Sequence, residues 1–195
     1  MGQLVYAGIG SLDGFVADAD GDFAWSAPDE EVHAYLNERD RRVTTELYGR
    51  RLYEVMKVWE TFGTEEDASE VERVYGEQWR GRPKVVFSRS LASVETARTR
   101  LERRFDPAEV RHLVDGTEGE VSIGGPELAG RALHAGIVDR VEYYLVPTVV
   151  GGGTPWLPAG LHLDLRLVEQ HRFGCGVVHL AYDVLDRRVP GEGRG

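Results

Sequence analysis

Strand-like runs alternate with amphipathic helical segments along the first two-thirds of the chain, and this alternation restricts the fold more than any other feature. The strand-like runs, rich in β-branched and aromatic residues, are 4–9, 43–48, 84–88, 99–105 and 120–123. The segments with helical spacing of apolar residues are 28–36, 50–56, 65–79, 106–114 and 127–135. Strands joined by helices pair in parallel, because the helix carries the chain back to the starting edge of the sheet. The pattern predicts an α/β domain with a largely parallel sheet.

The last third of the chain has consecutive strand-like runs with no helix between them. These runs are 140–150, 163–173 and 177–185, and Gly174-Cys175-Gly176 forms the turn of a hairpin between the last two. Hairpin strands pair antiparallel, so the sheet is expected to be mixed. We expect one domain over residues 1–186, followed by a disordered Gly/Pro-rich tail at 187–195.

Composition narrows the class of protein. A chain of 195 residues with 42% hydrophobic and 29% charged residues fits one globular domain with a sizeable core. Its one cysteine, Cys175, excludes an intramolecular disulfide and any multi-cysteine metal site. The net charge of −10 argues against nucleic acid as the main partner. The sequence shows neither a signal-peptide pattern nor an apolar run long enough for a membrane span, so a cytoplasmic location is expected.

Glycine, serine and arginine stand at three of the predicted strand ends. Gly124-Gly125-Pro126 separates a strand from a helix, Gly49-Arg50-Arg51 does the same earlier, and Ser88-Arg89-Ser90 follows a third strand. Glycine lets a ligand approach the backbone, helix amino termini attract anions, and arginine matches phosphate oxygens in a fork geometry. Ligands of open α/β sheets bind at the carboxyl ends of the strands. The sequence therefore predicts a phosphate site here, although each piece alone also fits a tight turn or a solvated charge.

Three carboxylates, Asp29, Glu30 and Glu31, open the first predicted helix and are candidate general acids. Carboxylates in a first helical turn are also favoured by the helix dipole alone, which is the structural alternative. Trp25 precedes them and would lower the local polarity. A carboxyl group beside an indole can have a raised pKa and donate a proton near neutral pH.

Other motifs are excluded by their spacing. Asp18-x-Asp20-x-Asp22 resembles the start of a calcium loop, but Phe23 stands where that loop needs glycine. Neither the G-x-G-x-x-G fingerprint nor the P-loop pattern occurs, and the six histidines lack metal-ligand spacing. We expect no metal site, and we assign Cys175 no catalytic role.

Taken in order, these segments resemble the dihydrofolate-reductase-like superfamily. They are most similar to the reductase domain of the bifunctional riboflavin-biosynthesis deaminase-reductase and to its stand-alone relatives. The pieces that carry the resemblance are 11–17, 25–31, 49–54, 85–90, 123–128, 138–141 and 147–155. No zinc-deaminase motif occurs in the sequence, so we expect the reductase half without the deaminase half. The acidic segment 65–79 and the Gly151-Gly152-Gly153 loop depart from the ordinary dihydrofolate reductases.

The resemblance implies a mixed, mostly parallel sheet of eight or nine strands, flanked by helices, that binds NADPH. It assigns the pyrophosphate to Gly49-Arg50-Arg51 and Gly124-Gly125. It assigns the adenosine 2′-phosphate to Ser88 and Arg89, and the nicotinamide to segment 11–17. The cofactor-binding residues it implies are Ala7, Val16, Gly49, Arg50, Arg51, Ser88, Arg89, Gly124, Gly125, Glu127 and Leu128. Trp25 and Asp13 are expected to bind substrate. Glu30 matches the acidic residue that the family carries at the start of its first helix, and Asp29 is the second candidate for the proton donor.

The function implied is that of an NADPH-dependent reductase of a small heterocyclic (pterin- or pyrimidine-like) or carbonyl/imine substrate. Both a 5-amino-6-(5-phosphoribosylamino)uracil reductase-like activity and a dihydrofolate reductase-like activity remain open. A non-catalytic nucleotide-binding or interaction protein that keeps the fold is the alternative, and a structural dimerisation domain is a third interpretation. We also expect a homodimer formed through the strands of 140–150 and 163–185, because long uncovered sheet edges tend to be paired or protected.

Overall fold

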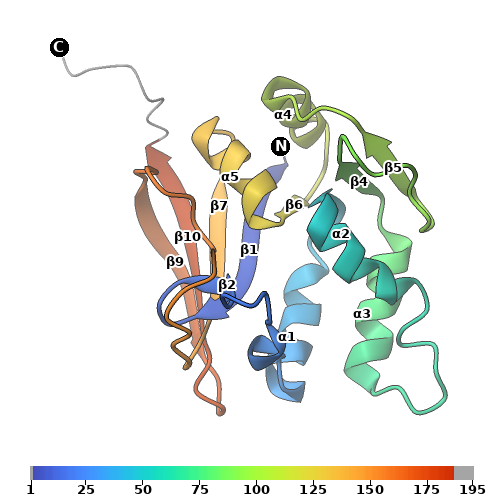
Figure 1. Ribbon diagram of the computed structural model, residues 1–195, viewed down its shortest axis with the longest axis vertical. Coiled ribbons are helices and arrows are strands. Elements are labelled where there is room, and N and C mark those ends of the chain that lie inside the picture. The colour runs from blue at the N-terminus through green and yellow to red at the C-terminus, as the bar shows by residue number, and fades with distance from the viewer. Residues whose placement is uncertain (1, 187–195) are drawn as a thin grey trace.

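The computed structural model describes residues 2–186, and its centre is one eight-stranded sheet (Figure 1). The expected tail at 187–195 lies outside the described residues. The sheet order is β5-β4-β3-β6-β1-β7-β10-β9, and β2 pairs with β8 in a separate two-stranded ribbon. The strands are β1 (Gln3–Ser11), β2 (Phe15–Ala17), β3 (Val43–Gly49), β4 (Lys84–Phe87), β5 (Thr99–Glu102), β6 (Glu120–Gly124), β7 (Arg140–Val146), β8 (Thr154–Pro155), β9 (Asp164–Arg172) and β10 (Val178–Asp186).

The pairing confirms the expected mixed sheet. All neighbours from β5 to β7 are parallel, whereas β10 is antiparallel to both β7 and β9. The helices are α1 (Glu30–Asp40), α2 (Arg50–Met56), α3 (Glu70–Gly81), α4 (Pro107–Asp115) and α5 (Pro126–His134), with 3-10 turns η1 (Ala24–Ser26) and η2 (Lys57–Glu60). The carboxyl ends of β1, β3, β4, β6 and β7 therefore share one edge of the sheet.

Several expected boundaries were wrong by a few residues, each for a local reason. The helix expected at 65–79 begins at Glu70, because Ser69 and Glu72 form a capping box there. The helix expected from residue 28 begins at Glu30, because the Asp29 side chain caps it. The strand expected at 140–150 ends at Val146, where Pro147 has no N–H to donate to the ladder. The strand expected at 99–105 ends at Glu102.

The two faces of the sheet are covered by different helices. Adjacent residues on one strand point to opposite faces; Val85 packs in the cluster that holds the apolar residues of α4 and α5, whereas Val86 packs with Trp79 of α3 and Tyr53 of α2. Helix α1 covers the neighbouring part of the second face, where Val32 packs with residues of β7 and the C-terminal hairpin. The molecule is thus a three-layer sandwich with helices on both sides of the sheet (Figure 1).

Strand β1 carries a glycine trough, formed by Gly8 and Gly10, on the face covered by α4 and α5. A Cβ at Gly8 would stand 2.8 Å from Trp156 Nε1, and one at Gly10 would collide with the Tyr143 hydroxyl. Trp156 stacks on Tyr143 with ring centroids 4.2 Å apart. The two aromatic side chains, together with the Phe15 carbonyl at Gly10, therefore occupy the space that these glycines leave.

Buried charges lie between α1 and the sheet. Arg39 pairs with Glu142, whose other oxygen lies 3.2 Å from Nε2 of the fully buried His179. Burial raises the pKa of Glu142, but the His179 hydrogen bond and the Arg39 charge outweigh it and hold that pKa below its usual value. Tyr35 continues the network by donating to Glu169 at 2.7 Å. Each buried charge thus has a partner, which is the condition for burying it.

A second buried group sits where α1, β3 and the start of β4 meet. Arg82 donates to Glu46 at 2.9 Å and forms an ion pair with Asp40 at 3.3 Å. Glu46 is 3% exposed, and burial raises its pKa to about 7 against the opposing charge of Arg82.

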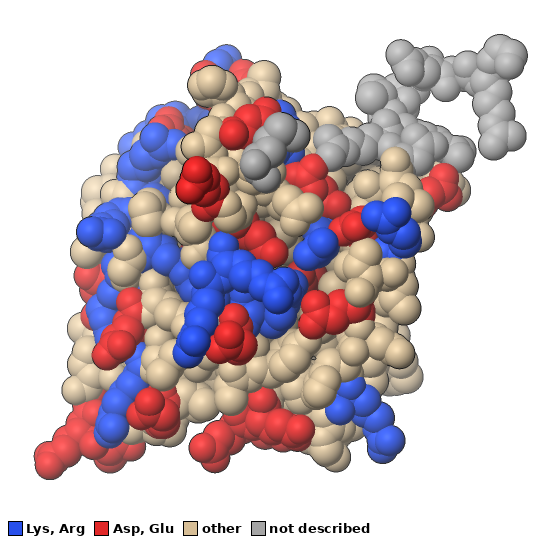
Figure 2. Space-filling view, turned by 180° about the vertical axis from the view of Figure 1, so that it is seen from behind, with Lys and Arg blue, Asp and Glu red and all other residues tan. Residues whose placement is uncertain are grey.

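The surface charges are unevenly distributed. Figure 2 shows Lys and Arg side chains gathered across the middle of the rear face, with a group of Asp and Glu side chains below them. Within residues 2–186, none of the helices combines the length and the apolar character that a membrane crossing requires.

Candidate functional site

Three loops predicted to bind phosphate meet at the carboxyl edge of the sheet. Strands β4, β3 and β6 are neighbours, with Gly49 opposite Phe87 and Tyr48 opposite Gly124. A Cβ built on Gly125 would lie 3.8 Å from the Gly49 nitrogen. Arg50 donates from Nη1 to the Ser90 hydroxyl at 2.9 Å, which joins the first loop to the third. We call Gly49–Arg51, Ser88–Ser90 and Gly124–Gly125 the strand-end site.

Two helices begin at this site with glycine as the N-cap and no side-chain cap. Gly49 caps α2 and Gly125 caps α5, whereas the other three α-helices are capped by side chains of Asp29, Ser69 and Asp106. The first amides of a helix need an acceptor. Gly125 has φ +89°, a conformation that side chains rarely adopt. The glycine pair therefore leaves the amides at the start of α5 uncovered by a capping side chain.

The arginines of the site differ in how they are engaged. Arg50 donates through Nε to Glu54 at 2.8 Å as well as to Ser90. The side chains of Arg51 and Arg89 are exposed and form no hydrogen bond or ion pair with another described residue. Two guanidinium groups are thus free to pair with a phosphate.

Ser88 and an unpredicted residue, Arg103, shape the third loop. The Ser88 hydroxyl accepts hydrogen bonds from the amides of Ser90 (3.3 Å) and Leu91 (3.0 Å), so its acceptor capacity is used within the loop. Arg103 donates to the carbonyls of Ser88, Leu91 and Ala92. No local motif identifies Arg103, because its partners are carbonyls brought near it only by the pairing of β4 with β5.

The three candidate acids at the start of α1 have separate surroundings. Asp29 accepts from the Val32 amide at 2.9 Å, and Glu31 accepts from the Gly174 amide at 2.9 Å. Glu30 is exposed and has no hydrogen bond or ion pair within residues 2–186. The nearby Trp25 indole donates to the Asp22 carbonyl at 3.1 Å. Of the three, Glu30 alone has no structural hydrogen bond.

Asp13 joins the two loops that follow β1 and β7. Its carboxylate accepts from the amides of Gly151 (2.7 Å) and Val150 (3.2 Å). Hydrogen bonds from the Ser11 hydroxyl and from these amides lower the pKa of Asp13. This expected substrate ligand therefore also has a structural role.

The remaining predicted residues do not form one group. Leu128 is buried beside the strand-end site, since a Cβ on Gly49 would lie 3.5 Å from its Cβ. Glu127 is exposed and pairs with Arg131 on α5. Val16 lies on β2 and packs against the main core. Ala7 lies on the opposite face of β1 from the glycine trough and lines a cavity of about 30 Å³ beneath α1.

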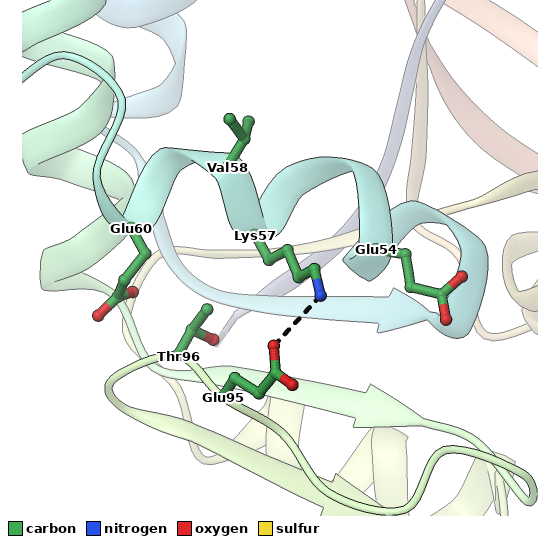
Figure 3. Close-up of a pocket in the computed structure, with 6 residues that line it drawn as sticks. All are labelled: Glu54, Lys57, Val58, Glu60, Glu95 and Thr96. Carbon is green, nitrogen blue, oxygen red and sulfur yellow. Dashed lines mark hydrogen bonds and ion pairs between the residues drawn. The ribbon is translucent and has the colours of Figure 1, made fainter.

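A larger hollow, of about 380 Å³, opens beside α2 (Figure 3). It is lined by Glu54, Lys57, Val58, Glu60, Glu95 and Thr96. Lys57 crosses it to pair with Glu95 at 3.2 Å, so the one cation of the lining is already neutralised. The three carboxylates would repel phosphate, and the hollow is therefore not part of the strand-end site.

Comparison with known proteins gives a consistent family and fold. The RibD C-terminal domain family matches residues 3–179. The uncharacterised protein YyaP of Bacillus subtilis is 25% identical over 176 residues, covering 88% of this chain and 89% of that protein. A crystal structure of a putative riboflavin biosynthesis protein from Shewanella sp. PV-4 superposes with TM-score 0.70 at 18% identity, over 95% of this chain and 100% of that chain.

Two further solved structures extend the comparison. The diaminohydroxyphosphoribosylaminopyrimidine deaminase/5-amino-6-(5-phosphoribosylamino)uracil reductase of Thermotoga maritima has TM-score 0.64 at 15% identity over 94% of this chain, which spans only 57% of that protein. Dihydrofolate reductase of Enterococcus faecalis, complexed with NADP(H) and RAB-propyl, has TM-score 0.59 at 13% identity over 94% of this chain and 97% of that one. At these identities the structures establish the fold.

Proposed function

The chain belongs to the RibD C-terminal domain family, and we propose that it is an NADPH-dependent reductase of a small heterocyclic substrate. Its fold is that of the reductases of riboflavin biosynthesis and of dihydrofolate reductase. Because a fold hosts many functions, the proposal depends on the residues of the site.

One observation carries the proposal: the glycine-capped start of α5 faces Gly49, and the side chains of Arg51, in the first turn of α2, and Arg89, after β4, have no partner among the described residues. A dinucleotide brings a pyrophosphate that needs close backbone approach and amide donors, and the glycine pair offers both. NADPH brings in addition a 2′-phosphate, for which a free guanidinium is the matching partner. The residues present therefore fit this cofactor.

The proposed chemistry assigns separate tasks to cofactor and protein. When bound, the nicotinamide supplies the hydride. The strand-end site holds the phosphates, and the loop after β1, fixed to the loop after β7 through Asp13, lines the reacting end. Glu30, at the start of α1, holds the proton that completes the reduction.

We infer that the substrate is a pyrimidine related to the one named for the Thermotoga maritima protein, 5-amino-6-(5-phosphoribosylamino)uracil. Dihydrofolate is the second candidate, since a dihydrofolate reductase shares the fold. The test is consumption of NADPH by the purified chain with each compound and with simple aldehydes. Turnover of the pyrimidine supports the proposal, whereas NADPH binding without turnover of any compound supports a non-catalytic nucleotide-binding protein.

Cofactor preference gives an independent test. The Arg89→Ala variant should bind NADPH more weakly by about 1.5–3 kcal/mol, the contribution of one charged hydrogen-bonding partner, and NADH almost unchanged. Fluorescence titration with each dinucleotide measures both affinities. Equal losses for the two would remove Arg89 from this role.

A further inference from the structure

The loop that follows β4 is held in place by one side chain from the neighbouring strand. Arg103, just beyond β5, donates from Nη1 to the Ser88 carbonyl at 3.4 Å and to the Leu91 carbonyl, and from Nη2 to the Ala92 carbonyl at 3.2 Å. These acceptors lie on both sides of Arg89 and Ser90 in sequence. The guanidinium therefore clamps the base of the short segment that carries those two residues.

Two more contacts restrict the same segment. The Ser88 amide donates to the Glu102 carbonyl at 2.9 Å, which extends the β4–β5 pairing to the edge of the loop. Arg50 donates to the Ser90 hydroxyl at 2.9 Å from the other side. Residues 88–92 are thus preorganised before any ligand arrives, and preorganisation lowers the entropy cost of binding.

The charge of Arg103 is not neutralised by a carboxylate. Among the described residues it forms no ion pair, whereas the flanking Arg100 and Arg104 lie 3.7 Å from Glu102 and Asp106 respectively. The planar guanidinium carries five N–H donors in a rigid fork that reaches three carbonyls spread along this loop, whereas a lysine ammonium is a compact group on a flexible stem. Arg103 thus adds positive charge to the loop while it fixes the loop's shape.

We propose that Arg103 is a positioning residue that sets the preference for NADPH over NADH by holding Arg89 and Ser90 where a 2′-phosphate binds. This inference rests on the proposed function. It assigns discrimination to a residue that need not touch the cofactor, because the loop conformation is the quantity that Arg103 controls.

The experiment measures affinity for NADPH, NADH, adenosine 2′-monophosphate and adenosine 5′-monophosphate in the full chain. Arg103→Ala should weaken NADPH and the 2′-monophosphate at least tenfold and change NADH and the 5′-monophosphate less than twofold. Arg103→Lys should lose most of the same preference, because it keeps the charge and loses the fork. Arg100→Ala and Arg104→Ala are the matched controls and should keep the wild-type ratio.

The outcomes separate the two proposals. If the unaltered chain binds neither dinucleotide, the proposed function fails. If it prefers NADPH and Arg103→Ala keeps that preference, or loses affinity for both dinucleotides equally, the positioning role is wrong. Full retention of the preference in Arg103→Lys would show that charge alone acts, and would also overturn it. Thermal unfolding of each variant verifies that the chain remains folded.

Discussion

At the scale of single residues, the first turn of α1 separates three carboxylates that the sequence presents as equivalent. Asp29 caps the helix, Glu31 holds the turn of the C-terminal hairpin through Gly174, and Glu30 faces outward without a partner in the described chain. The side chains of Asp29 and Glu31 are thus held by backbone amides, whereas that of Glu30 is free to contact a ligand. Glu30 therefore stays our candidate for the proton donor.

Replacing Glu30 by Gln should lower turnover roughly 10²–10⁴-fold, the usual contribution of a general acid. NADPH affinity should be unchanged, and the fall in rate toward alkaline pH that comes from loss of the proton of the general acid should disappear. Steady-state kinetics with a substrate of the enzyme measure the turnover and its pH dependence, and fluorescence titration measures the NADPH affinity. The control is Glu31→Gln, which removes a negative charge at the neighbouring residue. Full activity in the Glu30 variant would mean that water or another group delivers the proton.

Glu46 gives the free energy of unfolding a pH dependence of predictable sign. Its pKa in the folded chain is about 7 against 4.5 for the ordinary group. A raised folded pKa means that its stabilising contribution is complete below pH 4.5 and is lost as the pH rises through 7. The loss amounts to about 3 kcal/mol. Urea denaturation below pH 4.5 and above pH 7 should show this fall in the free energy of unfolding. The Glu46→Gln variant should lack the part of the fall that comes from Glu46, whereas a variant of an exposed carboxylate, Glu54→Gln, should keep it.

At the scale of elements, the helix starts distinguish structural turns from a ligand site. Three α-helices close their first turn with their own side chains, and two leave that role to glycine at adjoining strand ends. Substitution at Gly125 is a poor test of this idea. Gly125 has φ +89°, so any side chain there is strained, and Gly125→Val would disturb the fold as well as cofactor binding.

Gly49→Ser is the sharper substitution. Gly49 has φ −73°, and an added Cβ would meet Leu128 at an ordinary contact distance of 3.5 Å, so serine fits. Serine caps better than glycine by a few tenths of a kcal/mol, so stability should be equal or slightly higher. NADPH affinity should fall by about 1–2 kcal/mol, because the hydroxyl occupies amides meant for phosphate. Thermal unfolding and cofactor titration together test this; unchanged affinity would mean that Gly49 is only a turn.

The sequence predicted helices and strands well where turn or capping residues mark their ends. The hairpin turn at 174–176 and the helix after Asp106 follow from turn and capping residues, and both are confirmed. The order of the strands is set instead by long-range packing, which no window of sequence contains; β6 lies between β3 and β1, although β3 comes much earlier in the chain. The contacts of Arg103 were missed for the same reason. The three loops predicted to bind phosphate could be identified because their glycine, serine and arginine residues are consecutive in the sequence.

At the scale of the whole molecule, the edge of the sheet that is formed by strand β9 is poorly covered. Strand β9 is the last strand of the sheet, and its apolar residues Leu165, Leu167 and Val168 are 39–48% exposed. Long apolar edges invite pairing with another chain. The homodimer expected from the sequence stays a prediction, and this edge is the surface we propose for it.

Light scattering after gel filtration at micromolar concentration should give twice the mass of one 21.7 kDa chain. Leu167→Lys should convert the dimer to monomer, because it buries a charge at the interface. The control is Val58→Lys on η2, where the replaced side chain is 51% exposed and far along the chain from β9. A monomeric mass for the unaltered chain would refute the dimer.

The glycine trough of β1 also has a consequence for how this chain can evolve. Position 8 is restricted to glycine because the Trp156 indole lies over it, whereas position 10 is blocked both by the Tyr143 hydroxyl and by the Phe15 carbonyl. A lineage that gains a methyl group at position 8 must therefore first lose part of the indole. A smaller residue in place of Tyr143 does not free position 10, because the backbone carbonyl of Phe15 still occupies the space. Substitutions at positions 8 and 156 are thus coupled, although these positions lie far apart in the sequence.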